Sequence, residues 1–153
     1  VGSIDIEDAC LVLKSGYSGK CGLFDLSDGK QVIDFRYDDI ILLGFNRALG
    51  KDGSRRYLLD TSTGDVIASL PPNIGAAHFN ETPVTWIFRA KSYYGIIDEE
   101  GNILYEDAKD PLTGVTKFRH GFSGGQKDNK KWGILKSDGT WLVHPTYDYI
   151  KLL

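Results

Sequence analysis

The sequence predicts an all-β fold built from four tandem units of about 38 residues. Glycine-closed turns recur at near-equal spacing, short apolar segments flank each turn, and no window of a dozen residues carries an uninterrupted helical period. The closing glycines are Gly29, Gly64, Gly101 and Gly139, at intervals of 35, 37 and 38 residues. A fixed period in this range is typical of repeat proteins. We expect one repeat domain over residues 1–153, with units at about 4–43, 44–80, 81–118 and 119–153.

Each unit is predicted to form a meander of three short antiparallel strands, because β-branched and aromatic residues dominate these segments. The first strands are predicted at residues 10–13, 47–49, 85–88 and 125–127. The second strands begin at Cys21, Tyr57, Tyr94 and Trp132. The third strands are predicted at residues 31–33, 66–68, 103–105 and 141–143. Each closing glycine lies where a hairpin turn needs a positive φ angle, which glycine adopts at no steric cost.

The connections between units are predicted to be less regular. Residues 37–40 and 147–150 follow the third strands at equivalent places, and their aspartates can cap a single helical turn. Residues 69–83 and 106–122 contain four of the five prolines and are predicted as loops. An open twisted stack of units is favoured over a small propeller, because about 38 residues is short for a four-stranded blade.

The fourth unit contains a recognisable motif in residues 131–135, 137–139 and 143–148, with the sequences KWGIL, SDG and VHPTYD. These segments resemble the WG-repeat (KWG-repeat) family of bacterial proteins. The first unit keeps part of the motif, although Cys21 replaces the tryptophan, and the second unit diverges most. The resemblance implies an all-β repeat protein of bacterial origin. It implies no common enzymatic activity, cofactor or ligand.

Composition excludes several classes of protein. The chain has 18 basic and 21 acidic residues, a net charge of −3, which argues against a dedicated nucleic-acid binder. Its longest apolar runs, such as residues 40–43, are too short for a membrane span. The predicted hairpin places Cys21 opposite Lys14 and away from Cys10, so we expect no disulfide. Two cysteines without a predicted disulfide favour a reducing compartment, and we expect a cytoplasmic protein.

Candidate catalytic motifs lack the context that their chemistry needs. Residues 121–125 match the G-x-S-x-G pattern of a nucleophile elbow, but no amphipathic helix follows. We therefore interpret Ser123 as an incidental serine in a glycine-rich turn, whose replacement by alanine leaves stability unchanged. The three histidines lack the spacing of metal ligands. We expect no catalytic residue, no metal and no cofactor.

The aromatic residues divide by their position in the repeat. Trp132 aligns with Tyr94 and Cys21, so we expect it in the core, and Trp86 lies in an apolar run that also indicates core. Trp141 aligns with Gln31, which indicates a half-exposed position. Trp141 beside a basic stretch would make an anchor with a charged rim. The predicted binding residues are Trp141, Lys127, Lys130, Lys131 and Tyr147.

Three functions fit these observations. The leading hypothesis is a non-catalytic module that binds a protein partner, for example an inhibitor or an immunity-type protein. The alternative is a carbohydrate or cell-wall binding module that uses exposed aromatic rings such as Trp141 and Tyr93. The third is an enzyme of unknown class.

Overall fold

The computed structural model describes residues 5–7, 9–79 and 83–151. These residues form sixteen β-strands and no helix, so the predicted all-β repeat fold is confirmed. Among them, no helix is long and apolar enough to pass through a bilayer.

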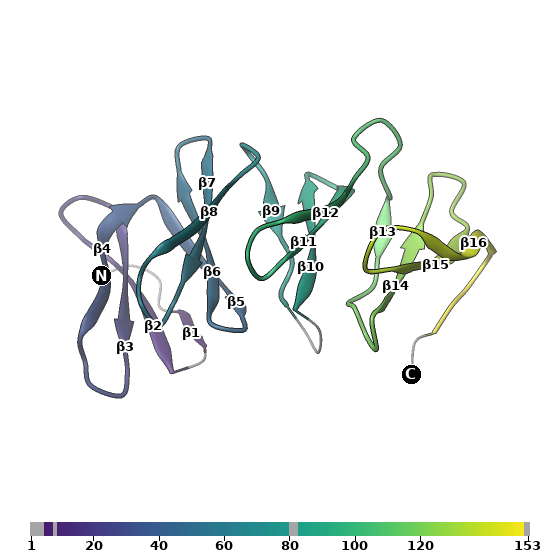
Figure 1. Cartoon of the computed structure of the whole chain (residues 1–153). Helices are drawn as coiled ribbons and strands as arrows, with labels where there is room; N and C mark the ends of the chain where they lie inside the picture. The colour runs from purple at the N-terminus through teal and green to yellow at the C-terminus, as the bar shows by residue number, and fades with distance from the viewer. Residues whose placement is uncertain (1–4, 8, 80–82, 152–153) are drawn as a thin grey trace. The chain divides into compact units, whose positions relative to one another are not determined.

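The strands form four open antiparallel sheets, each a meander of four consecutive strands (Figure 1). Sheet 1 contains β1 (Asp5–Glu7), β2 (Cys10–Lys14), β3 (Cys21–Asp25) and β4 (Gln31–Tyr37). Sheet 2 contains β5 (Asp39–Gly44), β6 (Arg47–Asp52), β7 (Arg55–Asp60) and β8 (Val66–Leu70). Sheet 3 contains β9 (Gly75–Ala76), β10 (Val84–Arg89), β11 (Ser92–Asp98) and β12 (Ile103–Glu106). Sheet 4 contains β13 (Gly114–Val115), β14 (Phe122–Gln126), β15 (Trp132–Lys136) and β16 (Trp141–Tyr147).

Each sheet has one strand more than the three that the sequence predicts, and the additional strand comes first. Strand β5 begins at Asp39, with only Asp38 between it and the end of β4 at Tyr37, where we expected a helical turn. Strands β9 and β13 lie inside the connections that we expected to be loops. Four strands therefore fit in a unit of this length, and a four-stranded meander is the form of a propeller blade. The length of the unit does not separate an open stack from a propeller.

The chain divides into two compact units, residues 1–73 and residues 74–153, and each unit contains two sheets. In the first unit, Leu23 and Ile33 of sheet 1 share a buried cluster with Ile40 and Leu59 of sheet 2. In the second unit, Trp86 and Ile96 of sheet 3 share a cluster with Leu135 of sheet 4 and with Leu112 and Phe118. The core of each unit thus lies between its own pair of sheets.

Two kinds of glycine recur in the sheets. The closing glycines Gly29, Gly64, Gly101 and Gly139 have φ angles of 72°, 81°, 80° and 85°, as predicted. The glycine of the Trp-Gly motif has another role. A Cβ atom at Gly133 would lie 2.3 Å from the carbonyl oxygen of Val143, and one at Gly22 would lie 2.8 Å from that of Ile33. Both glycines lie beside a β-bulge. There the backbone of the neighbouring strand occupies the space that a side chain would need.

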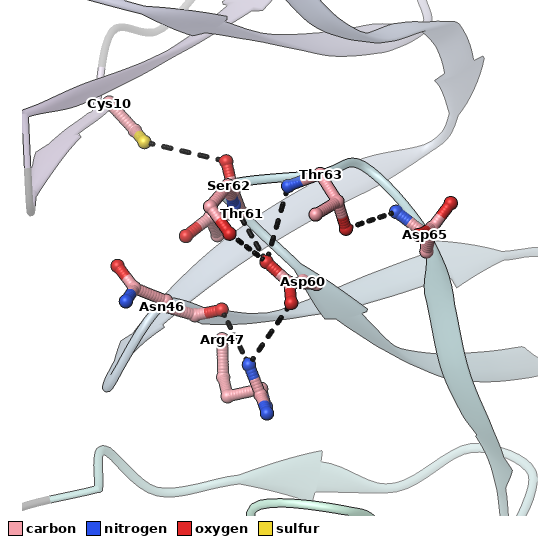
Figure 2. Close-up of polar contacts among 8 residues, drawn as sticks. All are labelled: Cys10, Asn46, Arg47, Asp60, Thr61, Ser62, Thr63 and Asp65. Carbon is pink, nitrogen blue, oxygen red and sulfur yellow. Dashed lines mark hydrogen bonds and ion pairs between the residues drawn. The ribbon is translucent and has the colours of Figure 1, made fainter.

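In the turn between β7 and β8, the carboxylate of Asp60 binds the residues that precede the closing glycine (Figure 2). The carboxylate of Asp60 accepts hydrogen bonds from the backbone N–H (2.8 Å) and the hydroxyl (2.6 Å) of Ser62, and it lies 3.6 Å from the Arg47 guanidinium. Burial raises the pKa of Asp60, but the hydrogen bonds from Ser62 and Thr63 and the charge of Arg47 outweigh it, so the pKa lies below its usual value.

Asp60→Asn is expected to lower the free energy of unfolding by about 1–2 kcal/mol at pH 7, because the hydrogen bonds to a charged acceptor are weakened. A lowered pKa contributes stability above the pKa of the unfolded state, and this contribution is lost as the pH falls through the folded value. Urea denaturation from neutral to acidic pH should therefore show the difference from the parent shrinking below about pH 4. Asp65→Asn is the matched control, since Asp65 enters this turn through its backbone N–H. A pH-independent difference would contradict this role of the Asp60 charge.

Candidate binding surface

Two consecutive residues in β3, β7, β11 and β15 distinguish the two faces of each sheet. In the first compact unit, residues 1–73, Leu23 of sheet 1 and Leu59 of sheet 2 meet in one cluster. In the second unit, Ile96 of sheet 3 and Leu135 of sheet 4 do the same. We call the face that carries Leu23 or its equivalents Leu58, Ile96 and Ile134 the forward face. The rear face carries Phe24, Leu59, Ile97 and Leu135.

Burial at these eight positions identifies two uncovered faces. Six of the eight side chains are fully buried: Leu23, Leu58, Leu59, Ile96, Ile97 and Leu135. The two exceptions, Phe24 and Ile134, are only half-buried. They belong to the rear face of sheet 1 and to the forward face of sheet 4. Apolar residues on these two faces thus lack the cover that the repeat gives them elsewhere.

The forward face of sheet 4 is the larger departure from the repeat. Trp132 pairs with Tyr147, and Ile134 pairs with Val143, so these four side chains share one face. We call this set, with Lys131 and Asp148 at its edge, the end surface. The equivalent residues of sheet 1 are Cys21, Leu23, Ile33 and Tyr37, and all are buried. Tyr37 is 4% exposed, whereas Tyr147 is 56% exposed.

An ion pair between Lys131 and Asp148 borders the end surface. Lys20 and Asp38 form the equivalent pair in sheet 1. There, Asp38 also accepts a hydrogen bond of 2.6 Å from the backbone N–H of Gly53, in the β6–β7 turn of sheet 2. The hydrogen bond from Lys20, followed by that from Gly53, holds the pKa of Asp38 below its usual value. The Lys and Asp of the repeat motif therefore attach one sheet to the turn of the sheet that follows. In sheet 4, the Asp148 side chain is 87% exposed.

The structure separates the five predicted binding residues. Lys131 and Tyr147 lie together on the end surface. Trp141 pairs with Leu135 on the rear face and packs against the cluster around Trp86, so it points away from that surface.

The other two residues lie in the turn between β14 and β15. Lys127 forms a 2.7 Å ion pair with Asp110, and Lys130 has a φ angle of 65°. The tryptophan of the end surface is instead Trp132, which we expected in the core and which is half-buried. The expectation for Trp132 was wrong because it came from the alignment with Tyr94 and Cys21. Those two residues are buried because a further sheet covers their face.

Ser123 lies in strand β14 and not in a turn, and it is completely buried. Its hydroxyl accepts a hydrogen bond from Nε1 of Trp86 (2.9 Å) and donates one to the carbonyl oxygen of Thr116 (2.7 Å). The expectation that Ser123→Ala leaves stability unchanged is therefore corrected. The serine of the G-x-S-x-G pattern supports the core tryptophan of the second unit.

We now expect Ser123→Ala to lower the free energy of unfolding by about 1–3 kcal/mol, because the buried Trp86 N–H loses its acceptor. Guanidinium denaturation of a double-mutant cycle with Trp86→Phe checks this cause. In the Trp86→Phe background there is no indole N–H to satisfy, so the cost of Ser123→Ala should be smaller. Equal costs in both backgrounds would show that the hydrogen bond is unimportant.

The repeat motif matches a known family over residues 132–152, described as "WG containing repeat". The fourth repeat is a WG repeat. The predicted resemblance is confirmed for this segment, which includes the Trp132-Gly133 pair and most of the end surface. No curated protein matches the chain significantly in sequence.

Several solved structures share the fold of this chain. The computationally designed Ika8 protein matches with a TM-score of 0.59 and 13% identity, over 94% of this chain and 49% of its own. BamB from Moraxella catarrhalis matches with a TM-score of 0.52 and 16% identity, over 82% of this chain and 41% of its own. The computationally designed Ika4 protein matches with a TM-score of 0.55 and 14% identity, over 87% of this chain and 88% of its own. This chain thus spans about half the length of Ika8 and less than half of BamB.

Proposed function

We propose that this chain is a non-catalytic protein-binding repeat module and that the end surface is its docking site. The carrying observation is the contrast between Tyr147 and its equivalent, Tyr37. The same residue type at the same repeat position is buried in sheet 1 and largely exposed in sheet 4. The partner is therefore a protein that presents an apolar surface able to cover Tyr147, Trp132 and Ile134.

The chemistry of the end surface fits a protein better than a sugar. A carbohydrate site usually offers aromatic rings beside polar groups, whereas two of the four central residues here are aliphatic, Ile134 and Val143. Apolar side chains with aromatic anchors and a polar rim are typical of protein interfaces. The Lys131–Asp148 pair supplies such a rim. An inhibitor or immunity-type role is one specific form of this proposal.

A comparison of two surface variants tests the proposal. The tagged chain and its Tyr147→Asp and Val66→Asp variants are each used to recover proteins from a lysate of the source organism. Val66 is the matched control, because it is an exposed apolar residue of β8 (48%) outside the end surface. We expect the same protein with the parent and with Val66→Asp, and its loss with Tyr147→Asp. Recovery that is insensitive to Tyr147→Asp would remove the end surface from the function.

A further inference from the structure

We infer that the partner of the end surface is a second copy of this chain, which docks through the rear face of its sheet 1. This inference rests on the proposed function and names the partner. It starts from the two faces on which the repeated pattern of burial within the chain fails, the forward face of sheet 4 and the rear face of sheet 1. Inside each compact unit, the forward face of one sheet packs against the rear face of the next sheet. The two uncovered faces are therefore one of each kind.

The rear face of sheet 1 is apolar and open. Leu11, Leu13, Phe24 and Phe35 are half-buried, and the rings of Phe24 and Phe35 lie 5.9 Å apart. Leu13, Phe35 and the exposed Tyr17 line a shallow pocket of about 440 Å³. Phe24 occupies the position at which Leu59 and Leu135 are completely buried on the rear faces of sheets 2 and 4.

The end surface has the matching half. In the first compact unit, the forward-face residues Leu23, Ile33 and Tyr37 of sheet 1 are covered by Ile40 and Leu59 of sheet 2. Sheet 2 is itself a four-stranded repeat sheet. Ile134, Val143 and Tyr147 hold the same positions in sheet 4. A surface built on this pattern fits the rear face of another repeat sheet. In a second copy, the open face of that kind is the one with Phe24 and Phe35.

The polar edge of the contact leads to the same partner. Inside the first unit, Asp38 accepts a hydrogen bond from the β6–β7 turn of the covering sheet. The β2–β3 turn, residues 15–19, takes the corresponding place in sheet 1, and it borders the rear-face pocket through Gly16 and Tyr17. In the pair of copies, Asp148 of one chain accepts a backbone hydrogen bond from this turn of the other.

The contact is head-to-tail, so it uses two different surfaces and leaves both available on each copy. Such contacts form a closed ring when the rotation between copies allows it and a filament when it does not. The chain spans 49% of Ika8, which has the same fold. Two copies together have about the length of that longer chain, and we infer a closed pair.

Sedimentation equilibrium of the full chain, over nanomolar to high micromolar concentrations, tests the pair. We expect the parent and the Val66→Asp control to be dimers. Tyr147→Asp, on the end surface, and Tyr17→Asp, beside the rear-face pocket, should each raise the dissociation constant about thirtyfold or more, the effect of a lost hot-spot contact. Both tyrosines are exposed, and far-UV circular dichroism should show that the variants keep the fold.

A mixture of the two variants distinguishes a head-to-tail contact from any other. Each variant spoils a different half, so Tyr147→Asp and Tyr17→Asp together keep one intact contact and should form a one-to-one complex that neither forms alone. A monomeric parent, a dimer insensitive to both variants, or a mixture without rescue would each overturn the inference. If the parent were monomeric but still recovered a different protein from the lysate, and Tyr147→Asp abolished that recovery, the inference of a second copy would be wrong. The proposed function would then still hold.

Discussion

Trp86→Ala is expected to lower the free energy of unfolding by about 3–5 kcal/mol, as the removal of a large buried aromatic side chain does. The Trp86 ring is 1% exposed, stacks on Phe118 at 5.5 Å and meets the edge of Tyr105 at 6.5 Å. The variant also removes the indole N–H that donates to Ser123. The measurement is chemical denaturation followed by circular dichroism, at a protein concentration too low for association.

Trp132→Ala is the matched control for this experiment, since it removes the same side chain from the half-buried end surface of the same compact unit. It should cost clearly less than Trp86→Ala in the monomer, because part of the Trp132 side chain already faces solvent. If Trp132→Ala cost as much as Trp86→Ala, the division of the two rings between the core and the end surface would be wrong.

Gly133→Ala is expected to lower the free energy of unfolding by about 3 kcal/mol, at the upper end of the usual cost of overpacking. The new Cβ atom would lie 2.3 Å from the Val143 oxygen and 2.7 Å from the Trp141 ring. The first of these neighbours is backbone, so it can move only if the bulge between β15 and β16 is disturbed.

Gly16→Ala is the control for Gly133→Ala, because a Cβ atom there has no neighbour within 4 Å. Its effect on the free energy of unfolding should stay within about 0.5 kcal/mol of the parent, as for most surface substitutions. Equal effects at Gly16 and Gly133 would show that close backbone approach is not the reason for the glycine in the Trp-Gly motif.

The repeat could be predicted from sequence because its turns have strict local requirements. A positive φ angle at Gly29, Gly64, Gly101 and Gly139 favours glycine, and the strands beside these turns are long enough to show an apolar pattern. The first strands of sheets 3 and 4 were missed for the opposite reason. Strands β9 and β13 have two residues each, too few for any alternation, and their pairing depends on β10 and β14.

The candidate surface was only partly predictable. Tyr147 and Lys131 could be named from the motif, but alignment gives the position of a residue in the repeat and not which of the two faces lacks a covering sheet. Trp132 and Trp141 are separated by a bulged pairing and point to opposite faces, which no sequence period shows. The burial of Ser123 depends on Trp86, 37 residues away, and no local pattern contains that contact.

The hydrogen bond between Asp38 and Gly53 has a consequence for how repeats can be added to such a protein by gene duplication. It joins Asp38, which lies between β4 and β5, to Gly53 in the β6–β7 turn of the next sheet. A duplication that cuts at this corner would carry a complete forward face, its Lys–Asp pair and a complete rear face together. Each added repeat would then contain both of the surfaces that pack on its neighbours, and the number of sheets could change without changes in the sheets already present.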